Sequence, residues 1–147
     1  EANEYLGEAL NELGEQASKS GTFLIYEPLN RYETNLFNRF EDAANFLDKL
    51  DTSGVRLLAD LFHMNIEESN PSASILEGSR HLGHVHFADS NRRPVGCGHT
   101  NMIPIAQVLR DLNYDGCISA EAFDWPDPDS AALQTIESFN KYFGNES

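Results

Sequence analysis

The 147-residue sequence has no run of about 20 apolar residues, the length that a membrane-spanning helix needs. It also holds only two cysteines, Cys97 and Cys117, and their spacing fits neither a zinc cluster nor a disulfide framework. These absences favour a globular protein of a reducing compartment, and we expect it to be cytoplasmic. Cys117 is expected to be a small buried residue of the core.

Positive charge is scarce as well. Ten lysines and arginines stand against 24 aspartates and glutamates, which gives a formal net charge of -14 at pH 7. A surface of this sign repels phosphates at long range, so nucleic acid and anionic membranes are excluded as partners. The composition leaves a small-molecule ligand as the expected partner.

The first residues, Glu1-Ala-Asn-Glu4, contain neither a Met nor the basic and apolar segments of a signal peptide. They lead directly into a helical pattern that has no strand before it. We therefore expect the sequence to be part of a longer protein whose first half is absent here.

The sequence does contain a regular alternation of helical and strand patterns. Amphipathic spacing predicts a leading helix over residues 3–19, and short apolar runs predict four strands, each followed by a helix. The strands are expected at 22–26, 55–59, 84–88 and 117–120, and the helices that follow them at 40–50, 72–79, 103–112 and 130–142. One α/β domain over residues 1–147, with a parallel sheet, is therefore predicted.

Periodicity alone does not choose between a doubly wound sheet and a barrel. A complete (β/α)₈ barrel takes roughly 250 residues, so four βα units make about half of one. Half a barrel would expose two strand edges and one side of an apolar core. We expect these surfaces to be covered in a homodimer or by a missing N-terminal half.

Each predicted strand ends in a residue that can bind a metal ion or move a proton: Glu27, Asp60, His86 and Glu121. The carboxyl ends of parallel strands in a barrel meet at one face, so these residues are expected to converge. Three carboxylates repel one another unless their pKa values rise or a cation lies among them. Oxygen ligands with one nitrogen suit Mn²⁺, Mg²⁺ or Co²⁺ better than a structural zinc. Any one of the four, taken alone, could equally be an ordinary polar residue at the rim.

Four segments together resemble a known family. They are Tyr26-Glu-Pro-Leu-Asn-Arg-Tyr-Glu33, Ala59-Asp-Leu-Phe-His-Met-Asn-Ile-Glu-Glu68, His84-Val-His-Phe-Ala-Asp-Ser-Asn-Arg92 and Gly96-Cys-Gly-His99. They are similar to the ketose 3-epimerase branch, which includes D-tagatose and D-psicose 3-epimerases, of the xylose isomerase-like barrel superfamily. The resemblance runs from about residue 23 to 123 and implies the C-terminal half of a (β/α)₈ TIM barrel.

The resemblance also implies roles for individual residues. Glu27, Asp60, His86 and Glu121 would hold the metal ion, with Mn²⁺ as first choice and Mg²⁺ or Co²⁺ as alternatives. Epimerisation at C3 of a ketose through an enediolate needs a base on one face and an acid on the other, and Glu27 and Glu121, which come from strands on different sides of the ion, suit these roles. Three further residues would contact the sugar or sugar phosphate: Glu33, His63 and Arg92. From the residues alone, Glu33 could be exposed, His63 could cap a helix or lie at the rim, and Arg92 could be a solvated charge.

Several alternatives stay open at this point. An aldose-ketose isomerase of the hydroxypyruvate type and an inosose dehydratase share this metal architecture, and a half barrel could also bind metal without catalysis. The apurinic endonuclease of the same superfamily needs a surface compatible with DNA, which the net charge of -14 argues against. The segment Gly96-Cys-Gly-His99 is interpreted first as a tight turn and second as a phosphate loop.

Overall fold

The structure, a computed structural model, describes residues 1–144. In chain order the elements are α1 (Ala2–Lys19), β1 (Leu24–Tyr26), α2 (Phe40–Leu47), β2 (Val55–Asp60), α3 (Leu61–Glu67), α4 (Pro71–Gly78), the 3₁₀ turn η1 (Ser79–His81), β3 (Leu82–His86), α5 (Met102–Asp111), β4 (Cys117–Ser119) and α6 (Pro128–Phe143). No helix among the described residues is both long enough and apolar enough to cross a bilayer.

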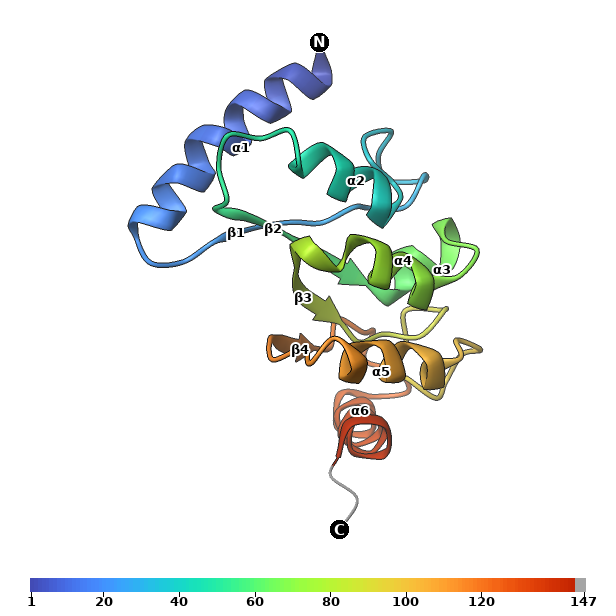
Figure 1. Cartoon of the computed structure of the whole chain (residues 1–147). Coiled ribbons are helices and arrows are strands. Elements are labelled where there is room, and N and C mark those ends of the chain that lie inside the picture. The colour runs from blue at the N-terminus through green and yellow to red at the C-terminus, as the bar shows by residue number, and fades with distance from the viewer. Residues whose placement is uncertain (145–147) are drawn as a thin grey trace.

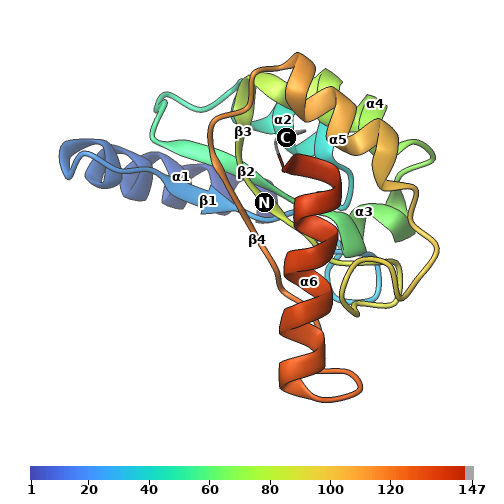
Figure 2. The same ribbon diagram turned by 90° about the horizontal axis from the view of Figure 1, so that it is seen from below.

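The four strands form one parallel sheet in the order β1-β2-β3-β4. Helices α2, α4, α5 and α6 pack each against the next, and they cover one face of the sheet as a continuous layer (Figures 1 and 2). Strand order that follows chain order, with a helix in every crossover, is the arrangement of consecutive units in a (β/α)₈ barrel. The predicted leading helix and four βα units are confirmed.

The two faces of the sheet differ in what covers them. Ala59, Val85 and Ile118 lie in register across three strands and contribute to the core beneath the helices. Residues one position earlier point to the opposite face, because side chains alternate along a strand. Cys117 lies on that opposite face and is exposed, so the expectation that it is buried is wrong. The physical reason is that β4 is an edge strand and the inner face of four strands has no second layer over it.

The strand β3 begins two residues before the predicted 84–88, and a short helix, α3, lies where a loop was expected. The side chain of Asp60 explains α3, because its Oδ1 accepts hydrogen bonds from the amides of Phe62 and His63 at 2.8 and 3.3 Å. The chain therefore turns directly from β2 into a capped helix at the carboxyl end of the sheet.

Candidate metal centre

The structure brings the four strand-end residues into one cluster. Glu27 follows β1, Asp60 and His86 are the last residues of β2 and β3, and Glu121 comes just after β4. One potential ligand atom from each residue lies within 4.8 Å of the other three. Because the strands are parallel and adjacent, residues that are distant in sequence converge at this edge, as the sequence predicts.

The two carboxylate oxygens of Asp60 make different contacts, one with helix α3 and one within the cluster. Oδ1 caps α3, whereas Oδ2 lies 3.2 Å from Nδ1 of His86. The same His86 nitrogen lies 2.9 Å from Oε2 of Glu121. The side chain of Asp60 has no exposed surface, and its hydrogen bonds to the first amides of α3 hold it in place.

Glu27 supplies the evidence that the cluster fits a cation. Its Oε1 is buried and accepts no hydrogen bond from any described residue. Burial, reinforced by the negative charges of Asp60 and Glu121 against the opposing effect of His86, raises the pKa of Glu27 to about 7. A buried acceptor without a donor, beside two more carboxylates and an imidazole, is a donor set that suits a divalent ion.

The three residues expected to contact a sugar lie beside this cluster. Arg92 places Nη2 2.9 Å from Oε2 of Glu121 and Nη1 3.3 Å from Nε2 of His63. His63 is 2% exposed, and its Nδ1 lies 3.7 Å from Oε1 of Glu33. The structure therefore brings all seven predicted residues together. Arg92 is not a solvated surface charge, because its side chain is only 17% exposed and lies over the ring of Phe62.

Arg92 is held by a loop with unusual backbone geometry. Its φ of 56° lies in the left-handed region, which non-glycine residues seldom adopt. The amide of Arg92 donates to the carbonyl of Asp89 at 2.9 Å, and its carbonyl accepts from the amide of Phe123 at 2.7 Å. These bonds connect the loop after β3 to the segment after β4. The guanidinium of Arg92 is thereby placed between two potential metal ligands, Asp60 and Glu121.

Asp89 organises the same loop from inside. This residue is 1% exposed, and its carboxylate accepts four backbone N–H bonds of 2.7–3.0 Å from Ser90, Gly96, Gly98 and Thr100. Burial raises the pKa of Asp89, but these four donors together lower it below its ordinary value. The glycine segment is therefore a turn whose amides bind a carboxylate of this chain, in line with the first of its two interpretations.

Asn30, Phe62 and Asp89 are functional candidates that the sequence reasoning missed. All three lie inside the motif segments, but their roles depend on contacts between different loops. Asn30 bonds to His63, Phe62 lies under Arg92, and Asp89 binds its own loop. A polar residue a few positions after a predicted strand is the signal in the sequence that could have indicated Asn30 and Asp89, and no such signal marks Phe62.

The free energy of unfolding of the metal-free chain is expected to fall as the pH rises from about 5 to about 8. Glu27 has an ordinary pKa of 4.5 when unfolded and a pKa of about 7 when folded, so between these two values the folded state retains a proton that the unfolded chain has lost. Stability that is present below the unfolded pKa is thus lost as the pH passes through the folded one. Urea unfolding in EDTA at both pH values measures the change. Glu27→Gln cannot ionise and should lose less, and an equal loss in both proteins would contradict the assignment.

The comparisons with known proteins agree with this geometry. Residues 1–142 match the family model described as xylose isomerase-like TIM barrel. The chain is 40% identical over 114 residues to a D-psicose 3-epimerase of Enterocloster bolteae, and 34% identical over 116 residues to a 3-dehydro-D-guloside 4-epimerase of Escherichia coli. These alignments cover 78% and 79% of this chain, but 38% and 44% of the relatives.

A solved structure of a D-allulose 3-epimerase from Methylomonas sp. superimposes with a TM-score of 0.88 at 28% identity. The match covers 93% of this chain and 54% of that one. The chain thus spans about half the length, or less, of the relatives that it matches. The predicted fold class is confirmed, and the chain belongs to the xylose isomerase-like TIM barrel family.

Proposed function

We propose that this chain supplies the metal-binding and proton-transfer centre of a divalent-metal-dependent sugar epimerase that acts at C3 of a ketose. The observation that carries the proposal is the convergence of Glu27, Asp60, His86 and Glu121 within 4.8 Å. The identity of 40% to a D-psicose 3-epimerase supports the substrate class. Among free sugars and sugar phosphates, the names of the relatives favour a free ketose.

Glu27, Asp60, His86 and Glu121 would hold the ion, and Mn²⁺ remains the first choice over Mg²⁺ and Co²⁺. When bound, a divalent cation would supply positive charge beside the carbonyl and neighbouring hydroxyl oxygens of the sugar, which eases loss of the C3 proton.

Glu27 and Glu121 would transfer the proton. They follow the two outermost strands of the described sheet, β1 and β4, so they would approach a bound sugar from different sides. One carboxylate would remove the proton from C3, and the other would return a proton to the opposite face of the planar enediolate, which inverts that carbon. A pKa of about 7 suits Glu27 to exchange a proton near neutral pH.

The remaining polar groups would orient the sugar. The guanidinium of Arg92 and the imidazole of His63 lie 3.3 Å apart, and both can donate to sugar oxygens. Glu33, with 49% of its side chain exposed, can accept from a hydroxyl group. Three fixed contacts around the reacting carbon would hold it between the two carboxylates.

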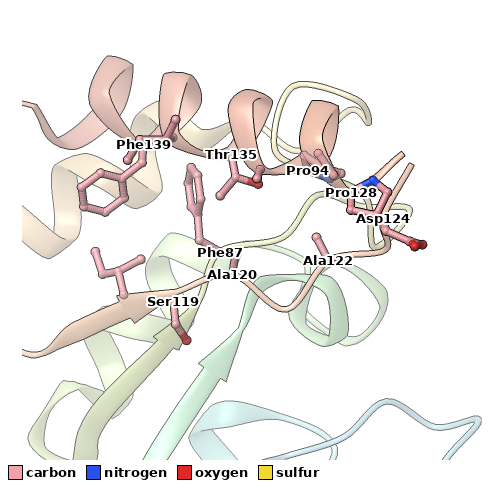
Figure 3. A pocket seen from close by; sticks show the side chains of 13 residues that line it. Phe87, Pro94, Ser119, Ala120, Ala122, Asp124, Pro128, Thr135 and Phe139 are labelled. Atoms are coloured by element: carbon pink, nitrogen blue, oxygen red, sulfur yellow. The ribbon is translucent and has the colours of Figure 1, made fainter. Parts of the chain in front are cut away.

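The outer edge of β4 pairs with no other strand among the described residues. A cavity of about 550 Å³ lies between β4 and α6, and apolar side chains such as Phe87, Ile118 and Phe139 line it (Figure 3). Ile136 on α6, which also lines it, is 52% exposed. An unpaired parallel edge with an adjoining apolar cavity is a docking surface for a further strand and its helix.

We propose that a complementary half barrel, rather than a second copy, closes this surface. Helix α1 precedes β1 and helix α6 follows β4, so both outer flanks of the sheet already carry a helix. Two copies joined edge to edge would bring α6 of one copy and α1 of the other to the same junction. A segment that alternates strands and helices and both begins and ends with a strand would bring no second helix to either junction.

Mixing the chain with the N-terminal half of the Enterocloster bolteae relative tests this partnership. We expect sedimentation to show a one-to-one complex that the chain does not form with itself. A stable homodimer of the chain, with no binding to the complementary half, would overturn it.

The reconstituted complex with Mn²⁺ is expected to interconvert D-psicose and its C3 epimer. Glu27→Gln and Glu121→Gln should each lower kcat by about 10²- to 10⁴-fold, because each removes one proton-transfer group. Glu77→Gln, an exposed change on α4, is the matched control and should leave kcat unchanged. A product inverted at C4 would instead favour the chemistry of the 4-epimerase relative, and no effect of either substitution would exclude the carboxylate pair.

A further inference from the structure

The side-chain amide of Asn30 is a buried connection between the loop after β1 and helix α3. Asn30 lies in the loop between β1 and α2, is 2% exposed, and contacts the ring of His63 on helix α3. Its Oδ1 accepts from the amide of Tyr32 at 2.9 Å, and its Nδ2 donates to Oε1 of Glu33 at 2.8 Å. A backbone N–H cannot accept and a carboxylate cannot donate, so these two partners fix which end of the Asn30 amide is oxygen and which is nitrogen.

With that orientation fixed, Nδ1 of His63 faces two donors. Nδ2 of Asn30 lies 2.7 Å away and the backbone amide of Asn30 lies 3.3 Å away. A ring nitrogen that faces two N–H groups must present its lone pair, and a neutral imidazole carries a single ring N–H. The hydrogen is therefore on Nε2.

Nε2 points toward the metal centre. It lies 3.6 Å from Oε1 of Glu27, the buried oxygen without a hydrogen bond, and 3.3 Å from Nη1 of Arg92. Arg92 is a donor only, so it offers no acceptor to an Nε2–H group. The opposite tautomer would turn Nε2 into an acceptor for Arg92, but it would leave an Nδ1–H group against both donors of Asn30.

We propose that Asn30 is a positioning residue that fixes His63 as the Nε2–H tautomer, so that His63 donates a hydrogen bond into the sugar site. The last step rests on the proposed function, because it needs a substrate oxygen as acceptor. The tautomer itself does not, since it follows from contacts within the chain. His63 is thereby set to bind a carbonyl or hydroxyl oxygen and not to accept from a hydroxyl hydrogen.

The tautomer can be measured directly in the metal-free chain labelled with ¹⁵N-histidine, by long-range ¹H–¹⁵N correlation at about pH 8, where histidine is ordinarily neutral. The signals of His63 are identified among the five histidines by their loss in His63→Gln. We expect the hydrogen on Nε2 in the wild type. A hydrogen on Nδ1 would overturn the proposal without reference to any other variant.

Asn30→Asp provides the complementary test because it keeps the shape and turns the donor at Nδ1 into an acceptor. We expect Nδ1 of His63 to become protonated in this variant. Asn38→Asp is the matched control: Nδ2 of Asn38 donates to the carbonyls of Leu29 and Thr34 in the same loop, but Asn38 forms no hydrogen bond with His63. If Asn38→Asp shifts the tautomer equally, general loosening of the loop explains the change and the proposal fails.

Turnover by the complex reconstituted with the complementary half separates this inference from the proposed function. Asn30→Asp should lower kcat/KM on D-psicose by about 10-fold while Mn²⁺ affinity stays within about 3-fold, since a tenfold loss corresponds to about 1.4 kcal/mol, in the range of one hydrogen bond. An inactive wild type with the Nε2–H tautomer would contradict the epimerase assignment alone. An active Asn30→Asp with a protonated Nδ1 would contradict the role of the tautomer alone.

Discussion

Asp60→Asn is expected to weaken divalent-ion binding by at least about 100-fold while leaving the fold intact, because altering even a residue that only supports a metal ligand costs 10- to 100-fold. Asn retains an oxygen that can cap α3, so the hydrogen bonds to the amides of Phe62 and His63 survive. The change removes one negative charge and replaces Oδ2, the oxygen that faces His86, with an amide nitrogen that cannot bind a cation. Isothermal titration with Mn²⁺ measures the affinity, and circular dichroism verifies the fold.

Asp127→Asn is the matched control for this experiment. Asp127 caps α6 through the amide of Ser130, as Asp60 caps α3, but it is exposed and takes no part in the metal cluster. We expect its substitution to leave Mn²⁺ affinity unchanged. If Asp60→Asn binds Mn²⁺ as tightly as the wild type, or if both substitutions weaken binding equally, the four-residue centre is not the metal site.

Much of this centre could be predicted because two simple regularities act together. Apolar runs with helices between them require a parallel sheet, and a parallel sheet places all its strand ends at one edge. Polar residues such as Glu27 and His86 at those ends must then converge, wherever they lie in the sequence. The side chains of the loops carry no comparable periodicity, so their roles came from the family resemblance.

The features that the sequence did not predict, or predicted wrongly, also have physical reasons. Helix α3 is seven residues long, too short for periodicity to reveal, and it forms because Asp60 caps it. Cys117 follows a strand pattern typical of burial, but burial on the inner face depends on how many strands surround it. The bond between Asn30 and His63 joins residues 33 positions apart through loop geometry that no local pattern specifies.

Asp89→Asn is the same chemical change as Asp60→Asn, but it is expected to destabilise the fold. The carboxylate of Asp89 uses both oxygens, since Oδ1 accepts from Ser90 and Thr100, and Oδ2 accepts from Gly96 and Gly98. Whichever way an asparagine amide is turned, its NH₂ group faces two N–H donors. Each buried donor that loses its acceptor costs about 1–3 kcal/mol, so the two together should lower the free energy of unfolding by about 2–6 kcal/mol.

Urea unfolding of the metal-free chain at neutral pH measures this loss, with Asp60→Asn as the control that should lose less stability because it keeps the oxygen that caps α3. The pH dependence adds a second criterion. The pKa of Asp89 is lowered in the folded chain, so its stabilising contribution is present above the unfolded value of 3.8 and is lost as the pH falls through the folded value. The difference between wild type and Asp89→Asn should therefore shrink in acid. If the difference in the free energy of unfolding between the two proteins stays constant down to the acid transition, the charge of the Asp89 carboxylate does not stabilise this loop. The position of Arg92 would then depend on the hydrogen bonds of its own backbone.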